Sequence, residues 1–261
     1  MLLLNPEFAT VLAQGSLTPP GAPAPTMKSL DQVEPRTAIT NLPFTINQGG
    51  SYYLTQSFEQ AFASDAISIR TNNVTLDLNG FTIHQTGNPP VIVGIRLENA
   101  VNVPLKNVIV KNGTVTGFNA PDITCLGIRN CVFENLVLTE STVSGISIQA
   151  FGTAGSVGNV LRHCRACDNS NTGVVFLSGS GNIQNVIEEC EALNNATGFS
   201  LSASSNLLIR CRASGNANNY SIAVGNREGT ITLAPTNSAV INGTSGGAGS
   251  GNTDPFGNLS Y

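Results

Sequence analysis

Six short segments of the chain repeat one alternation of apolar and variable positions. They cover residues 72–80, 106–113, 134–141, 162–169, 188–195 and 209–216. In each segment an apolar or small residue stands at the centre, another stands two positions later, and the residue between them is free to be polar. The centres are Val74, Val108, Leu136, Cys164, Cys190 and Cys211. Because alternation with a period of two is typical of a strand with one buried face, we predict that these six residues stack in one inward column.

The spacing of the segments predicts how the strands are connected. Successive centres lie 34, 28, 28, 26 and 21 residues apart, and each interval has room for strands and turns that bring the chain back over itself. Repeats of this length indicate a solenoid in which each coil stacks on the one before. We therefore predict an all-β chain folded as a right-handed parallel β-helix of about seven to eight coils. Its core narrows from Val and Leu in the early coils to Cys and Ala in the later ones.

The regions around the repeats set the expected boundaries within the chain. Residues 28–66 predict an N-terminal cap with the first strands and a short helix near 57–64, because a solenoid end has to hide its unpaired edge. Residues 67–235 form the predicted β-helix. Residues 236–261 are rich in Gly and predict an irregular C-terminal tail that folds back over the last coil.

A Gly followed by an apolar residue marks a second strand in each coil. These pairs are Gly94-Ile95, Gly127-Ile128, Gly145-Ile146, Gly173-Val174 and Gly198-Phe199. In the first two coils the pair follows the centre about ten residues later than in the others, which predicts inserted loops at 84–93 and 116–125.

Composition limits the expected partners and location. Charged residues make up only 11% of the chain, and its three Lys do not cluster, so nucleic acid, whose binding rests on phosphate neutralisation, is not an expected partner. No apolar stretch is long enough to span a bilayer. Residues 1–27 combine a signal-peptide remnant, which ends in V-L-A at Ala13, with a Pro-rich linker. We therefore expect an extracellular or cell-surface protein.

Three of the six cysteines share the inward column. Cys164, Cys190 and Cys211 would point in parallel from adjacent coils, whereas a disulfide needs side chains that converge. We therefore expect a ladder of small buried thiols. A zinc site is not expected, because no C-x₂-C pair is matched by a second one.

Charged residues flank the cysteine column on both sides. One column reads His163, Glu189, Arg210 and the other reads Arg165, Glu191, Arg212, and Arg162 with Glu188 adds a further opposite pair. One interpretation is ion pairing between coils that fixes their register. The other is a substrate-binding patch, made of these same residues, that grips a uronic-acid polymer.

Asn recurs just before the inward centres, at Asn73, Asn107 and Asn135. Asn ladders in solenoids satisfy the backbone groups of turns through their side-chain amides. We interpret these three residues as structural.

Several stretches of the chain resemble a known group of proteins. The sequences GGSYYLT, TNNVTLDLNGFTI and LKNVIVKNGTVTGF, together with TDPFGN near the end, are similar to bacterial secreted β-helix proteins of the pectate-lyase-like superfamily. The resemblance covers residues 40–261 and is specific for the fold. That superfamily contains polysaccharide lyases, glycoside hydrolases, esterases, epimerases, tailspikes, adhesins and structural solenoids, so the resemblance does not select one activity.

The resemblance implies a type of chemistry that the residues match only in part. Lyases of this kind often use Ca²⁺, held by carboxylates, to neutralise the substrate carboxylate, and Arg or Lys as the base. Asp77, Lys111 and Arg165 are the candidate catalytic residues, and Ca²⁺ is the cofactor that the resemblance allows. Asp77, in the sequence LDLNG, is equally well interpreted as a residue that stabilises a turn. The early coils lack a cluster of three Asp or Glu near a basic residue, so we identify no metal ligands.

Two hypotheses follow. The first is a secreted carbohydrate-active protein, a polysaccharide lyase or a saccharide binder, with a groove beside the inserted loops. The second is a non-catalytic structural or adhesive solenoid of an extracellular matrix, sheath or appendage. Ile109 and Val137, which we expect to point outward from neighbouring coils, indicate an apolar patch that would support a homo-oligomer, either a trimer or a filament. A glycoside hydrolase is less favoured, because Glu188, Glu189 and Glu191 lie on one strand beside basic residues.

Overall fold

The described part of the chain consists of strands and connecting turns. The computed structural model describes residues 35–87, 91–179, 181–233, 240–243, 247–248 and 254–261, so the predicted signal remnant and linker (1–27) lie outside the described residues. All regular structure among the described residues is β-strand, which confirms the all-β prediction. The predicted helix near 57–64 is wrong: β4 (Phe58–Gln60) lies there, because Phe58 takes a buried position beside Ile83 in the sheet.

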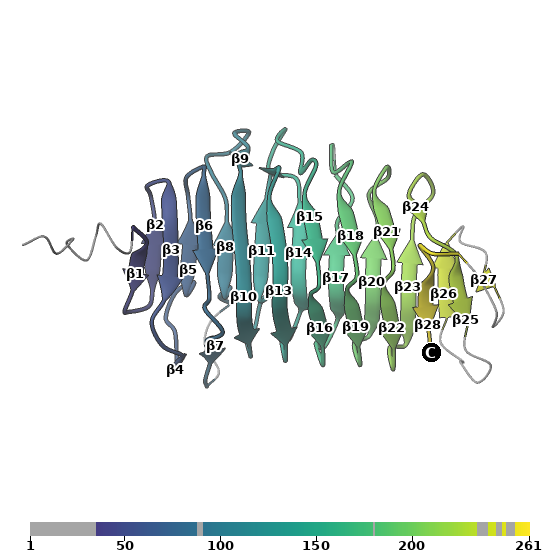
Figure 1. Cartoon of the computed structure of the whole chain (residues 1–261), viewed down its shortest axis with the longest axis horizontal. Coiled ribbons are helices and arrows are strands. Elements are labelled where there is room, and N and C mark those ends of the chain that lie inside the picture. Colours follow the sequence, from purple (N-terminus) through teal and green to yellow (C-terminus); the bar gives the residue numbers. More distant parts are fainter. Residues whose placement is uncertain (1–34, 88–90, 180, 234–239, 244–246, 249–253) are drawn as a thin grey trace, which may run out of the picture. The chain divides into compact units, whose positions relative to one another are not determined.

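One sheet contains a single strand from each coil. Its nine strands pair in parallel, each with the next along the chain, and therefore define a solenoid of about eight turns (Figure 1). They are β2 (Phe44–Ile46), β5 (Ile67–Ile69), β8 (Ile95–Leu97), β11 (Ile123–Leu126), β14 (Ser144–Gln149), β17 (Thr172–Phe176), β20 (Thr197–Leu201), β23 (Asn218–Ile222) and β26 (Val240–Gly243). The right-handed sense of the coils stays a prediction that rests on the preference of parallel crossovers.

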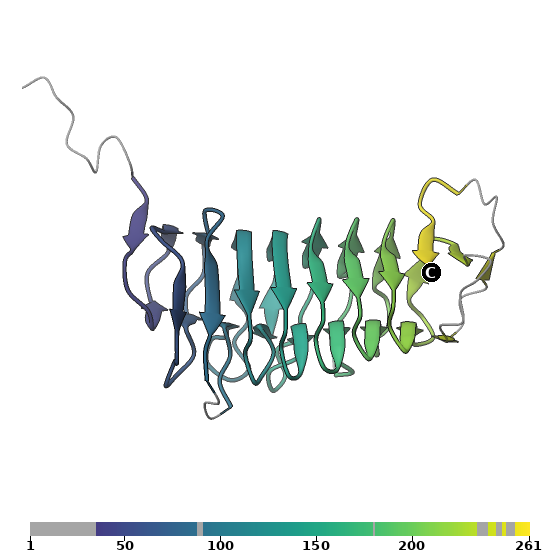
Figure 2. The same cartoon turned by 90° about the horizontal axis from the view of Figure 1, so that it is seen from below.

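The opposite sheet has seventeen strands because most coils contribute two short ones (Figure 2). Its first half-strands are β1 (Thr37–Ile39), β3 (Gly50–Leu54), β6 (Val74–Asp77), β15 (Val160–Arg162), β18 (Val186–Glu188), β21 (Leu207–Ile209) and β24 (Arg227–Glu228). The second half-strands are β4, β7 (Thr82–Gln85), β16 (Arg165–Cys167), β19 (Glu191–Leu193), β22 (Arg212–Ser214), β25 (Ile231–Leu233), β27 (Gly247–Ala248) and β28 (Asn258–Ser260). β10 (Val108–Thr116) and β13 (Val132–Thr139) run through both halves, and β9 (Leu105–Lys106) with β12 (Ile128–Arg129) forms a small third sheet.

The predicted inward column is correct in two parts and wrong at one junction. Val74 pairs with Val108, but β10 places Gly113, and not Val108, against Leu136. The later part holds, because the residues next to its centres pair in turn, and its members are Leu136, Cys164, Cys190 and Cys211. The alternation occurs twice in each coil of this sheet, once in each half, so the sequence pattern passes from one half to the other without a visible break.

The Gly-plus-apolar marker is confirmed in four coils and wrong in one. Ile95, Ile146, Val174 and Phe199 all lie in one inward column of the nine-stranded sheet. In the remaining coil Ile123 fills that column, whereas Gly127-Ile128 leads into the third sheet. Asp122, which precedes Ile123, therefore stands where those four coils have glycine.

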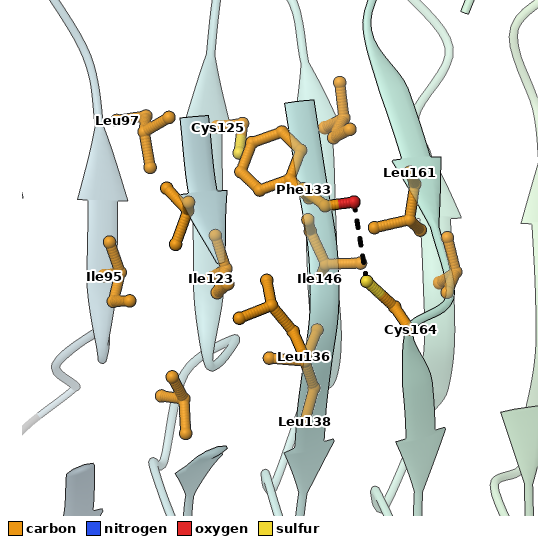
Figure 3. Packing of buried hydrophobic residues seen from close by; sticks show 14 of the residues in the cluster. Ile95, Leu97, Ile123, Cys125, Phe133, Leu136, Leu138, Ile146, Leu161 and Cys164 are labelled. Carbon is orange, nitrogen blue, oxygen red and sulfur yellow. Dashed lines mark hydrogen bonds between the residues drawn. The ribbon is translucent and has the colours of Figure 1, made fainter. Parts of the chain in front are cut away.

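The core lies between the two large sheets. Figure 3 shows Ile123 and Ile146 of the nine-stranded sheet near Leu136 and Leu138 of the opposite sheet, and all four are almost fully buried. This shared interior is the main apolar contribution to folding, because apolar side chains gain free energy in proportion to the area they remove from water.

The six cysteines are all free and buried, as expected for a thiol ladder. The Cys164 thiol donates to the carbonyls of Phe133 at 3.6 Å, drawn as a dashed line in Figure 3, and Arg162 at 3.2 Å. Burial raises the pKa of the Cys164 and Cys190 thiols well above the usual value and that of Cys131 to about 11. These thiols are therefore protonated at neutral pH and behave as small core side chains.

Two ladders of buried Asn run through the later coils. In one, the side-chain oxygens of Asn159, Asn185 and Asn206 accept from a backbone N–H of the preceding coil at 2.9–3.1 Å. The other ladder does the same through Asn169, Asn195 and Asn216. Asn73, Asn107 and Asn135 also form hydrogen bonds between stacked side-chain amides, but they do not share one column. Asn107 donates to Asn73, whereas Asn135 donates to Asn112 and so belongs to another column.

The described C-terminal residues close the last coil out of chain order. β28 pairs with both β22 and β25, and so lies between two strands that precede it in the sequence. The buried Tyr220 hydroxyl donates to the carbonyls of Cys211 at 3.0 Å and Leu259 at 2.6 Å, while Asn258 accepts from the Cys211 N–H. The described part of the tail is therefore an ordered strand within the sheet, where the sequence predicts an irregular segment.

Candidate functional site

The outer surface of the seventeen-stranded sheet gathers many of the charged side chains of the chain. We call this surface the charged face and define it by Asp77, Lys111, Glu134, Arg162, His163, Arg165, Glu188, Glu189, Glu191, Arg210 and Arg212. It contains every residue that the sequence analysis proposed as catalytic or substrate-binding. Those that lie within strands point outward because they alternate with the buried columns, and His163, Glu189 and Arg210 lie at bends between the half-strands.

The charges form bands that follow the coils. The coil of β15 and β16 carries Arg162, His163 and Arg165, and the next coil carries three glutamates at the equivalent positions. The coil after that carries Arg210 and Arg212. Opposite charges therefore meet between successive coils, which is the arrangement that holds a parallel register.

Contacts between the bands satisfy most of these groups. Arg212 Nη2 lies 2.6 Å from Glu191 Oε1, and Arg210 Nε lies 2.9 Å from Glu189 Oε1. The predicted opposite pair of Arg162 and Glu188 stacks in register, but the Arg162 guanidinium turns to the preceding coil, where its Nε lies 2.9 Å from Glu134 Oε2.

Arg165 is the loosest cation of the charged face. Its Nε lies 4.0 Å from Glu191 Oε2, and its side chain is 54% exposed, more than those of Arg162, Arg210 and Arg212. The partner carboxylate is already engaged by Arg212 at the shorter distance. A ligand acid or hydroxyl could therefore reach the Arg165 guanidinium without first breaking a close ion pair.

The three catalytic candidates do not converge. Asp77 and Lys111 stack on neighbouring strands, with 3.9 Å between Oδ2 and Nζ, and Arg36 Nη1 lies 3.8 Å from the same carboxylate oxygen. Arg165 lies in the other half of the sheet, two coils beyond Lys111 and three beyond Asp77, which is about 10 and 15 Å along the axis. A base and a charge-neutralising group for one substrate carboxylate would have to lie much closer to each other.

The surroundings of Asp77 do not provide a ligand set for a metal ion. Asp77 is a single carboxylate with two basic neighbours, which does not fit the six to eight oxygen ligands of Ca²⁺. Among the described residues, no three His, Cys, Asp or Glu side chains come together in a way that could hold a metal ion.

His163, Glu189 and Arg210 share an unusual backbone conformation. They occupy the bend between the half-strands with φ values of 51°, 52° and 53°. This left-handed region costs a residue with a Cβ about 1–2 kcal/mol, and Asn112 and Asn135 take it in the preceding coils at less cost. The chain therefore places charged side chains at a bend where Asn or Gly would be the ordinary choice.

An apolar stripe runs along the edge of the charged face. Its members are partly exposed and pair from coil to coil: Ile109, Val132, Val160, Val186 and Leu207. The prediction that Ile109 and Val137 form one patch is wrong, because Val137 pairs with Thr114 and Arg165 in the other half of the sheet. The same register shift that misplaced Val108 hid this stripe from the sequence analysis.

Asp122 is a buried acid without a partner. Neither of its carboxyl oxygens has a hydrogen bond among the described residues, and the side chain is fully buried. Burial raises its pKa well above the usual value, against the opposing effect of nearby backbone groups of Phe118 and Thr139. The carboxyl is therefore held toward its neutral form inside the solenoid.

A cavity of about 360 Å³ lies at the C-terminal end of the charged face. It is lined by Leu207, Ile209, Glu228, Gly229, Asp254 and Phe256. Leu207 is the last member of the apolar stripe, and Ile209 follows Glu188 in its outward column. The cavity therefore continues the charged face, although no sequence motif pointed to it.

No protein-family model, curated protein or solved structure matches the chain. The class that can be stated is a parallel β-solenoid with a face of banded charge, and no helix among the described residues could cross a membrane.

Proposed function

We propose that this chain is a saccharide-binding solenoid that lays an acidic polysaccharide along the charged face. The observation that carries the proposal is the apolar stripe of Ile109 to Leu207 beside a row of partly exposed arginines. Secretion and membership of the pectate-lyase-like superfamily belong to the same proposal and rest on the sequence resemblance and the N-terminal residues.

The two elements of the face suit the two sides of a sugar chain. The C–H surfaces of sugar rings pack on apolar side chains such as Val160 and Val186, which removes apolar area from water. Guanidinium groups match carboxylates with two parallel hydrogen bonds, so Arg165 and Arg212 suit uronate groups better than Lys would. Repetition at the coil spacing would let one chain make the same contacts several times.

Binding is favoured over lyase chemistry by the state of the candidate residues. Asp77 is flanked by Arg36 and Lys111, and Arg165 lies two coils beyond Lys111 and three beyond Asp77. Side chains that are this far apart can hold a polysaccharide in place. Proton abstraction by a lyase instead needs a base and a neutralising cation beside the same uronate group.

Affinity measurements test the proposal. Polygalacturonate, alginate and neutral dextran would be compared by affinity electrophoresis or calorimetry, and we expect retention by the acidic polymers only. Arg165→Ala should weaken that binding about tenfold, because one charge-assisted contact is lost. Arg70→Ala is the matched control, since Arg70 is an arginine of similar exposure paired with Glu98 outside the charged face.

Two results would contradict the proposal. Equal binding by the Arg165→Ala and Arg70→Ala variants would remove the charged face as the binding surface. Growth of ultraviolet absorbance from unsaturated products, abolished by Lys111→Ala, would restore the lyase hypothesis.

The apolar stripe also favours a second candidate, a structural or adhesive solenoid that self-assembles. A second copy could cover Val132, Val160 and Val186, since exposed apolar stripes often mark interfaces. Light scattering across concentrations tests it: a trimer or filament that Val186→Asp converts to monomer supports this candidate, and a monomer at all concentrations contradicts it.

A further inference from the structure

The cavity at the end of the charged face differs from the rest of that face in its charge balance. The glutamates of the bands have basic partners in adjacent coils, as Glu134, Glu189 and Glu191 illustrate. Glu228 lies in the cavity wall, and its Oε2 is buried with no hydrogen-bond partner among the described residues. An acid that is partly removed from water and left unpaired is costly unless something else supplies the partner.

The position of Glu228 in the fold explains this isolation. β24 has only two residues, and in the ladder Glu228 pairs with Leu208, a fully buried residue of the inward column. The acid thus ends a column that is apolar or aromatic over seven successive strands, at Tyr52, Leu76, Val110, Phe133, Leu161, Ile187 and Leu208. Burial raises the pKa of Glu228 above its usual value.

The second acid of the cavity is tied into a turn. Asp254 accepts from the backbone N–H of Phe256 at 3.0 Å and of Thr230 at 2.9 Å, and these contacts lower its pKa. Asp254 therefore stays negative and fixes the loop that carries Phe256. The Phe256 ring is 51% exposed, and its carbonyl accepts from the Arg210 N–H at 3.1 Å, which ties the cavity to the charged face.

The remaining walls are apolar. Leu207 and Ile209 come from β21, where Ile209 takes the place that an ionised side chain holds in the preceding coils. A volume of about 360 Å³ is within the range of small-ligand pockets, which combine apolar walls with a few polar groups. A ligand for these walls needs an apolar body together with positive charge.

We propose that this cavity binds an organic ammonium group carried on a compact C–H surface, with the ammonium beside the Glu228 carboxyl and the body against Phe256, Leu207 and Ile209. Such a group occurs both in amino sugars and in free cyclic amines. The site goes beyond the proposed binding of acidic polysaccharide, because it selects the opposite charge.

The test uses the full chain and small probes of matched shape. Cyclohexylamine and glucosamine, both protonated at pH 7, would be titrated by calorimetry or by NMR shifts, with cyclohexanol and N-acetylglucosamine as their neutral counterparts. We expect the amines to bind at least about tenfold more tightly than the neutral counterparts, because a charge-assisted contact is present only in the amines. Binding of glucosamine alone would identify the amino sugar as the source, and binding of cyclohexylamine alone would identify a free amine.

Substitutions locate the site. Glu228→Gln should remove the preference for amines, and Phe256→Ala, a change in an exposed loop residue, should weaken both amines. Glu140→Gln is the control, since Glu140 is an exposed acid whose Oε2 accepts from Thr116 at 3.3 Å, far along the chain from the cavity.

Three outcomes would overturn the proposal: no amine binding, equal binding of amines and neutral counterparts, or unchanged binding in both Glu228→Gln and Phe256→Ala. Failure of the polysaccharide proposal is recognised separately. Loss of polymer retention in Arg165→Ala concerns the arginines of the charged face, and the small amines contain no carboxylate for those arginines to bind.

Discussion

The early and later coils fill one inward column with different side chains. This column directly precedes the first outward residue of the first half-strand in each coil. In the coils of β6, β10 and β13 it contains Val74, Val108 and Cys131. From β15 onward it contains Asn159, Asn185 and Asn206. The later coils are also shorter, with 26 and 21 residues between centres against 34 at the start. A short coil encloses less apolar volume, so the later half relies more on buried amide hydrogen bonds and the early half more on apolar packing.

The largest expected effect comes from opening the apolar half. Phe133→Ala removes a fully buried ring at the level of β13 and should lower the free energy of unfolding by about 3–5 kcal/mol. Chemical denaturation checks the value. A loss below about 1 kcal/mol would show that the early core collapses around the missing ring and is less tightly packed than its burial indicates.

Converting a later coil to the early pattern should cost slightly less. Asn185→Val introduces the residue that Val108 supplies in the same column, but it removes the acceptor of both the Asn159 backbone N–H and one N–H of the Asn159 side-chain amide. Each buried orphan costs about 1–3 kcal/mol, so we expect a loss of about 2–4 kcal/mol by denaturation. Val108→Ile is a control that keeps the early column apolar, and an equal loss in both variants would contradict the ladder's role.

A smaller, pH-dependent effect is expected in the early coils, at Asp122 directly before β11. The folded-state pKa of Asp122 is raised above its unfolded value, so its contribution to stability is fully present below pH about 4 and is lost as the pH rises through the folded pKa. Asp122→Asn removes this loss, and its stability advantage over the natural chain should grow by about 1.4 kcal/mol for each pH unit in that window. Denaturation curves from pH 4 to 8 provide the check, and a constant difference would show that the carboxyl is not desolvated.

The smallest effect is expected on the charged face of the later coils. Glu191→Gln weakens contacts to Arg165 and Arg212, all of which are at least one-third exposed. Solvent screening limits such pairs to under about 1 kcal/mol, and 1 M salt should remove most of the difference. A loss of unfolding free energy that persists in high salt would mean that the charge bands do more than fix the register of the coils.

The comparison also explains what the sequence could and could not predict. Alternation and spacing were sufficient for the parallel solenoid and for the stack from Leu136 to Cys211, because inward positions must stay apolar or small. The pairing of Gly113 with Leu136 could not be predicted, because both halves of a coil show the same alternation of inward and outward residues. The Asn ladders leave a readable signal in the sequence, which is an Asn directly before Val160, Val186 and Leu207.

The candidate site was predictable in its charges and not in its surroundings. The columns of Arg165 with Glu191 and Arg212 follow directly from the coil spacing, and the structure pairs them. The cavity escaped because it depends on β28, which brings the turn at Asp254 beside β21 from 45 or more residues later in the chain. No local pattern encodes a contact of that range.

The stacked order of the coils has a mechanical consequence. If the described solenoid is pulled apart from one end, each coil leaves as a unit, because it contacts only its neighbours. The 21 to 28 residues of a later coil would lengthen the tether by about 70–100 Å at each rupture. The position of β28 between β22 and β25 interrupts this sequence, since one rupture there must release segments that are distant along the chain. In a force–extension trace that closing strand would be the step of unequal length.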